Sequence, residues 1–211
     1  MRYIIPAVLF LLLFSCKKPL TAGEGYLDVK GGKIWYSVAG GGDETPLVLL
    51  HGGPGAASAY LTPLLPLAED RPVIRFDQLG CGNSDRITDT TLMTVDNYVE
   101  QVRALLEKLN VKEYYLYGHS WGTMLGMDYY LKYPAGIRKL ILASPCISAR
   151  RWVADADTLI ASLDDSTELV LRNSMKNVSQ DAGRLKRAIG EYGARFYNRK
   201  PVAPAPPASC P

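Results

Sequence analysis

Residues 114–126, with the sequence YYLYGHSWGTMLG, decide which fold this chain is expected to adopt. The first four residues form an apolar run typical of a buried strand, and the residues after Gly122 show the broad apolar face of a helix. The turn between them reads Gly-His-Ser-Trp-Gly, with the serine at position 120. A strand, a Gly-x-Ser-x-Gly turn and a helix in this order are the layout of a nucleophile elbow, which makes Ser120 the candidate nucleophile.

The spacing of this motif has a physical reason. A serine on so tight a turn adopts an unfavourable backbone conformation, and the glycines two positions before and after it remove side chains that would collide. We expect the Ser120 hydroxyl to project above the sheet. The amide of Trp121 then lies at a helix N-terminus, where negative charge is stabilised. The pentapeptide alone also occurs in ordinary turns, so the flanking strand and helix carry the prediction.

A second motif, HGGPG at residues 51–55, follows an apolar run at residues 46–50 that is typical of a strand buried on both faces. Glycines let backbone amides approach a reacting oxygen closely, and Pro54 stiffens the loop. In a hydrolase with an elbow, one oxyanion donor follows the nucleophile and the other lies in the loop after the third strand. The expected donors are the amides of Gly53 and Trp121. A plain turn is the alternative for this loop.

A third segment, DQLGCGNSD at residues 77–85, follows the predicted strand at residues 73–76. We expect it to be a glycine-rich connection that shapes the floor of the pocket. Asp77 is expected to hold loops together by accepting hydrogen bonds from amides rather than to take part in chemistry.

The rest of the chain alternates predicted strands and helices, which implies a mostly parallel sheet wrapped by helices. Two strands around a glycine pair, at residues 26–29 and 34–38, predict a hairpin. Another strand is expected at residues 139–142. Helices are expected at residues 57–67, which include two prolines, and at residues 95–109, where the helical period is clearest. After residue 146 only helices are expected, at residues 152–163, 168–175 and 185–197.

The first 16 residues, MRYIIPAVLFLLLFSC, resemble the signal of a bacterial lipoprotein. One positive charge precedes an apolar run that is too short to span a bilayer comfortably, and residues 13–16 resemble a lipobox. We expect a signal peptide at residues 1–15, a lipid on Cys16 and a tether at residues 16–25, with an ordinary signal peptide as the alternative. The folded part would then be held at the bacterial cell envelope, in contact with the membrane only through this anchor.

Composition excludes several other classes of function. A net charge of +3, with no basic stripe, gives no indication of nucleic-acid binding. Besides Cys16 the chain contains Cys81, Cys146 and Cys210, with no Cys-x-x-Cys spacing, and only two histidines. Neither a disulfide framework nor a zinc site is indicated, and we expect no metal and no cofactor.

The three motifs together resemble the proline iminopeptidase (prolyl aminopeptidase) family of α/β-hydrolases, in the family's order and with similar intervals. The resemblance covers residues 25–197. It implies an α/β-hydrolase core at residues 26–146 and a partial helical cap at residues 147–197. It also implies a serine peptidase that releases N-terminal residues, often proline, from small peptides or hydrolyses amino-acid amides. By this likeness Ser120 is the nucleophile, and Gly53 and Trp121 form the oxyanion hole. The family's acidic cap residues cannot be aligned onto this chain, so no cap residue is assigned.

The resemblance stops before the catalytic apparatus is complete. In this fold class the triad acid and histidine follow the serine, yet no histidine follows His119 and no later strand carries an acid. His51 is expected to anchor its loop, and the His119 side chain to point away from the neighbouring hydroxyl. The family's final strands and last helix are absent, and residues 198–211 form a Pro/Ala-rich tail.

Two expectations follow from this incomplete resemblance. The strand at residues 139–142 would be an unpaired edge, which predicts low stability and aggregation. The chain as written would be close to inactive. A carboxylesterase and a non-catalytic surface lipoprotein are the alternatives, whereas dehalogenases and epoxide hydrolases would need an aspartate at position 120.

Overall fold

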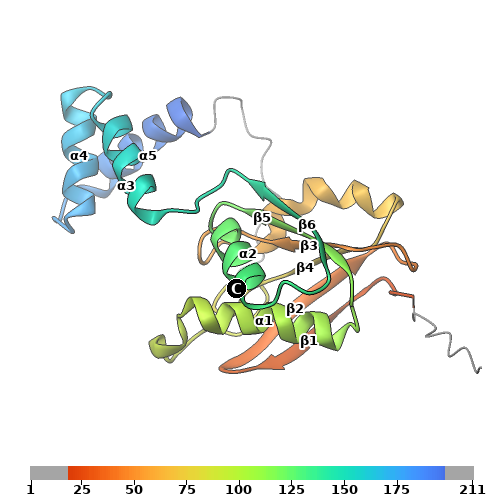
Figure 1. Cartoon of the computed structure of the whole chain (residues 1–211). Helices are drawn as coiled ribbons and strands as arrows, with labels where there is room; N and C mark the ends of the chain where they lie inside the picture. The colour runs from red at the N-terminus through yellow and green to blue at the C-terminus, as the bar shows by residue number, and fades with distance from the viewer. Residues whose placement is uncertain (1–18, 198–211) are drawn as a thin grey trace, which may run out of the picture.

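The computed structural model describes residues 19–197, which form one mixed sheet between helices and a group of helices beyond it (Figure 1). Within these residues the sheet has six strands in the order β1-β2-β4-β3-β5-β6. Their bounds are Gly23–Val29, Gly32–Ala39, Leu47–Leu50 (β3), Val73–Phe76 (β4), Tyr114–His119 (β5) and Ile137–Ala143 (β6). Neighbouring strands pair in parallel from β4 through β3 and β5 to β6. β2 pairs antiparallel with both β1 and β4. The expected α/β architecture is therefore confirmed. The expected signal peptide, Cys16 and the tail at residues 198–211 lie outside the described residues.

The N-terminal hairpin forms around the predicted glycine pair. Gly31 has a φ of 102°, a value that side-chain-bearing residues rarely adopt, so this turn requires glycine. β1 begins at Gly23, and Leu20 forms a bridge with Gly42. The described part of the segment that the sequence indicated as a tether is therefore partly built into the fold.

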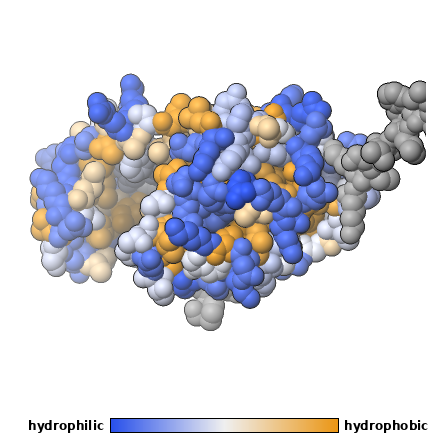
Figure 2. Space-filling view, turned by 60° about the horizontal axis from the view of Figure 1, so that its bottom comes forward, coloured by the Kyte–Doolittle hydropathy of each residue, from blue (hydrophilic) through white to orange (hydrophobic). Residues whose placement is uncertain are grey.

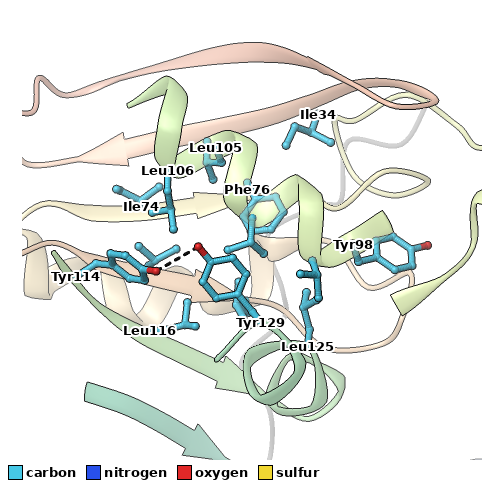
Figure 3. Close-up of a cluster of buried hydrophobic side chains, with 14 of the residues drawn as sticks. Ile34, Ile74, Phe76, Tyr98, Leu105, Leu106, Tyr114, Leu116, Leu125 and Tyr129 are labelled. Carbon is cyan, nitrogen blue, oxygen red and sulfur yellow. Dashed lines mark hydrogen bonds between the residues drawn. The ribbon is translucent and has the colours of Figure 1, made fainter. Parts of the chain in front are cut away.

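Two faces of the sheet are covered by different helices. α1 (Val95–Lys108) and α2 (Trp121–Lys132) cover one face, and η1 (Ser58–Glu69) covers the other (Figure 1). All four residues of β3 are buried, as its continuous apolar run predicted. Figure 3 shows the larger cluster, in which the Tyr114 hydroxyl donates a hydrogen bond of 3.2 Å to the Tyr129 hydroxyl. That pairing allows two phenol groups to be buried beside aliphatic side chains.

The structure corrects one helix prediction. Residues 57–67 were expected to form a helix interrupted by two prolines, and the structure has a continuous 3₁₀ helix, η1, over Ser58–Glu69. Pro63 and Pro66 lie inside it. Proline lacks the N–H that a regular α-helix needs and crowds the preceding turn, so the tighter helix forms instead. A further 3₁₀ turn, η2, spans Thr90–Leu92. By contrast, α1 agrees with its prediction to within one residue, and the Thr94 hydroxyl caps it by accepting from the Asn97 amide.

The last helices of the described chain form a unit with its own small core. They are α3 (Ala149–Ile160), α4 (Asp165–Met175) and α5 (Ala182–Phe196), joined to the sheet by the segment after β6 (Figure 1). Their buried residues are separate from the main cluster. Trp152 on α3 remains 53% exposed. The face in Figure 2 is mainly hydrophilic, with separate hydrophobic areas. Among residues 19–197 no helix is both long and apolar enough to cross a membrane.

β6 forms one edge of the described sheet, and β1 forms the other. Within residues 19–197 β6 pairs only with β5. Its outward-facing residues are partly exposed, including Ile141 at 41%. An exposed apolar strand edge is a template for pairing with another chain.

We predict that Ile141→Lys reduces self-association of the 211-residue chain, because a lysine on an edge strand opposes edge-to-edge pairing. The matched control is Leu131→Lys, which adds the same charge at a site 72% exposed on α2. Sedimentation velocity should show fewer large species for Ile141→Lys alone, with a change in unfolding free energy of about 0.5 kcal/mol or less. Equal association of both variants and the parent chain would contradict the role of this edge.

Candidate active site

Ser120 lies at the sharp turn between β5 and α2, as the sequence predicted. Its φ is 53° and its ψ is −121°, a strained conformation for a residue with a side chain. A Cβ at Gly118 would collide with the backbone of Gly122, and a Cβ at Gly122 would collide with the carbonyl of Leu50. Both glycines are therefore required for the chain to reverse at this point.

The Ser120 hydroxyl does not help to hold the turn in place. The residue is half-buried, and its hydroxyl makes no hydrogen bond to any residue from 19 to 197. The backbone around it is held instead: the Ser120 amide donates to the Ala143 carbonyl at 3.1 Å. The Thr123 hydroxyl donates to the Ser120 carbonyl at 2.6 Å. A fixed backbone and an unengaged hydroxyl suit a nucleophile, which also needs a base to take its proton.

The HGGPG loop lies directly against this turn. A Cβ on Gly52 would lie 3.1 Å from the Ser120 Cβ and 3.2 Å from the His119 carbonyl oxygen. Gly53, with a φ of 119°, is exposed beside it. The amides of Gly53 and Trp121 have no hydrogen-bond acceptor in the described part of the chain. Both predicted oxyanion donors are thus available, each on one of two segments that touch.

Neither histidine contacts the Ser120 hydroxyl. His51 is fully buried; its Nδ1 donates to the Gly52 carbonyl at 2.8 Å, and its Nε2 accepts from the Gln78 amide at 3.0 Å. Burial lowers the pKa of His51, so the ring is neutral and anchors the loop as expected. His119 Nδ1 bonds instead to the Tyr60 hydroxyl at 2.9 Å, and burial lowers its pKa also.

The segment after β4 joins the other two loops. Asp77 accepts from the amides of Ser58 at 2.7 Å and Asn83 at 2.9 Å, which is the structural role that the sequence predicted. Gln78 accepts from the indole Nε1 of Trp121 at 3.0 Å and donates to the His51 carbonyl at 3.2 Å. The strand ends of β3, β4 and β5 are therefore connected by buried polar side chains.

Two further observations describe the groups near this end of the sheet. Burial raises the pKa of Cys81 to about 12, and its thiol donates to the Gln78 carbonyl at 3.0 Å, so it stays protonated. No group of three His, Cys, Asp or Glu side chains among residues 19–197 is placed to hold a metal ion. A cavity of about 250 Å³ lies beside the HGGPG loop, with Pro54, Gln78 and Trp121 among its lining residues.

Tyr60 and Gln78 were missed by sequence reasoning. Tyr60 lies within a proline-containing stretch that predicted only a helix, and Gln78 lies in a segment interpreted as a glycine-rich connection. Neither has a local signal, because the partners of each side chain lie in segments that are distant in the sequence. The position of Gln78 directly after a strand-terminal aspartate was the one available hint.

The comparisons with known proteins agree with this fold. The family described as alpha/beta hydrolase fold matches residues 45–192, well over half of the chain. The chain belongs to the α/β-hydrolase fold family. The matched region includes the HGGPG loop, the elbow and most of the helices after β6.

Individual relatives of this α/β hydrolase include proline iminopeptidases. The proline iminopeptidase of Heyndrickxia coagulans is 41% identical over 179 residues, which are 83% of this chain and 62% of the relative. The crystal structure of VinJ has a TM-score of 0.78 at 30% identity, covering 88% of this chain and 64% of VinJ. That of the Mycobacterium smegmatis proline iminopeptidase has a TM-score of 0.74 at 28% identity, covering 86% and 64%. The chain thus spans less than two thirds of these relatives.

We predict that Gly122→Ala destabilises this α/β hydrolase by about 1–3 kcal/mol or more, because the added methyl meets backbone atoms that cannot move aside. Gly190→Ala is the matched control. Gly190 is exposed within α5, and its added Cβ would meet nothing within 4 Å. The control should stabilise the protein by about 0.5–1 kcal/mol. Denaturant unfolding measures both, and a neutral Gly122→Ala would show that the turn does not need this glycine.

Proposed function

We propose that this α/β hydrolase is a serine aminopeptidase of the proline iminopeptidase type. It would release N-terminal residues, often proline, from small peptides or hydrolyse amino-acid amides. One observation carries the proposal: the unengaged Ser120 hydroxyl sits at a strained turn against a glycine loop with a free amide. The names of its relatives, proline iminopeptidases among them, support the choice of substrate class.

The proposed reaction is acyl transfer through Ser120. The serine oxygen attacks the scissile carbonyl, and the amides of Gly53 and Trp121 stabilise the negative oxygen of the tetrahedral intermediate. The C–N bond breaks as the amine leaves with the proton given up by the Ser120 hydroxyl, and water then hydrolyses the acyl-enzyme and restores that proton to Ser120. Loss of one oxyanion donor typically lowers turnover ~10²–10³-fold, so the placement of these two amides matters.

The 211-residue chain itself is proposed to be only weakly active. A serine hydroxyl needs a base, and both histidines of the sequence are engaged with other partners. Binding and the oxyanion hole alone leave about 10³–10⁴-fold acceleration over water. The chain spans 62% of the Heyndrickxia coagulans relative, so a fusion to the rest of that relative tests the complete activity.

We predict that Ser120→Ala abolishes hydrolysis of an activated ester by the chain, whereas Ser174→Ala, on α4 away from the elbow, does not. The chain should react slowly with a fluorophosphonate probe. The fusion should react rapidly and release the amine from a proline anilide, both in a Ser120-dependent way.

Each alternative has its own outcome. Rapid probe labelling of the unfused chain would contradict the proposed weak activity. A fusion that cleaves esters quickly but leaves the anilide intact would indicate a carboxylesterase. Absence of any Ser120-dependent reaction in the fusion would favour a non-catalytic surface lipoprotein.

We also propose that Cys16 carries a lipid that holds the protein at the bacterial cell envelope. The support is the apolar run and the lipobox-like residues 13–16. In a bacterial host, we predict that a radioactive fatty acid labels the chain and that Cys16→Ser removes the label, while Cys81→Ser keeps it. Equal labelling of the Cys16 variant would contradict the anchor.

A further inference from the structure

One hydroxyl group contacts both segments that carry the proposed oxyanion donors. Tyr60, on η1, accepts a hydrogen bond from the Gly52 amide at 2.6 Å, and its oxygen lies 2.9 Å from His119 Nδ1. Gly52 directly precedes Gly53, and His119 directly precedes Ser120. The rings of Tyr60 and His119 also pack edge to face, with centroids 5.3 Å apart.

The direction of these hydrogen bonds follows from what each atom can do. The Gly52 N–H can only donate, so the Tyr60 oxygen accepts from it. The Tyr60 O–H then donates to His119 Nδ1, its one other hydrogen-bond partner among residues 19–197. His119 therefore carries its proton on Nε2. His51 has the opposite tautomer, because its Nδ1 donates and its Nε2 accepts.

The protonation states suit this arrangement at neutral pH. Partial burial raises the pKa of Tyr60 by more than the hydrogen bond from Gly52 lowers it, so the hydroxyl keeps the proton that it donates. Burial lowers the pKa of His119, so its ring stays neutral and offers a lone pair.

The hydrogen bonds of Tyr60 occur where the HGGPG loop and the Ser120 turn approach each other closely. Gly52 is buried, and a Cβ on it would lie 3.0 Å from the Tyr60 oxygen and 3.1 Å from the Ser120 Cβ. Gln78 also links the two segments, but through the Trp121 side chain and the His51 carbonyl. Tyr60 bonds the backbone immediately before Gly53, on the side of the loop that faces the nucleophile.

We propose that Tyr60 is a positioning residue that sets the spacing of the two oxyanion donors by binding Gly52 and His119 at the same time. This inference rests on the proposed function, because it assumes that the amides of Gly53 and Trp121 stabilise the reacting oxygen. Tyr60 itself does not touch the reacting atoms and acts through the loop.

The first test is spectroscopic and does not depend on catalysis. Long-range ¹H–¹⁵N spectra of the chain resolve its two histidines. The expected result is an Nε2–H tautomer for His119 and an Nδ1–H tautomer for His51. Tyr60→Phe should move the Nδ1 resonance of His119, which loses its donor, more than the resonances of His51, which keeps its hydrogen bonds to Gly52 and Gln78. An unmoved His119 resonance, or an Nδ1–H tautomer in the parent chain, would overturn the proposal.

The second test is kinetic, with Ser120-dependent ester hydrolysis as the readout. Tyr60→Phe keeps the ring contact and should lower kcat about 10-fold with little change in KM, less than the ~10²–10³ lost with a whole donor. His119→Leu removes the acceptor and should lower kcat by about the same factor as Tyr60→Phe. His119→Asn places an oxygen near the former Nδ1 and should lower kcat less than His119→Leu does. The Tyr60→Phe/His119→Leu double variant should be no worse than either single one.

The outcomes separate this proposal from the proposed function. If Ser120→Ala retains full activity, the proposed function fails, and the histidine spectra still decide the hydrogen bond. If Ser120→Ala is inactive but Tyr60→Phe matches the parent chain, the positioning role is overturned. Equal losses in His119→Asn and His119→Leu would overturn it also, since only the acceptor distinguishes them. Tyr192→Phe, on α5, controls for loss of a hydroxyl elsewhere.

Discussion

The structure depends on one steric constraint, the reversal of the chain between β5 and α2. The backbone of Gly122 passes so close to Leu50 and Gly118 that a single added carbon would overlap its neighbours. This close passage brings the start of α2 against the end of β3. It also holds Ser120 in a conformation that serine avoids elsewhere. The packing of the surrounding core maintains that strain, since β3 is wholly buried and β5 alternates buried and half-buried residues.

The parallel strands bring the loops of the candidate site together beside this turn. Because β3, β4 and β5 run in the same direction, the loops that follow them meet at one edge of the sheet. The loops after β3 and β4 contribute the buried side chains of His51, Asp77 and Gln78, and the end of β5 contributes the half-buried His119. Their hydrogen bonds run between loops, so the position of each loop depends on the others. A change in one of these segments is therefore expected to shift the positions of the other two.

The sequence predicted the features that have local causes. Glycine spacing specified the elbow, and continuous or periodic apolar runs specified β3, β4 and α1. The 3₁₀ form of η1 could have been argued from Pro63 and Pro66, which weigh against a regular helix. The partners of Tyr60 and Gln78 could not be predicted, because each joins segments that are distant in sequence and meet only in the folded protein. The pairing of β6 at one edge followed from strand order, whereas the early start of β1 had no sequence signal.

The separate core of α3, α4 and α5 has a consequence for cooperativity. In the described chain this core shares no buried residue with the main cluster around the sheet. Free energy of local opening need not be uniform across such a molecule, and amide hydrogen exchange can proceed in one unit while the other stays protected. The amides of α3, α4 and α5 are therefore expected to exchange independently of those in the β5–α2 turn.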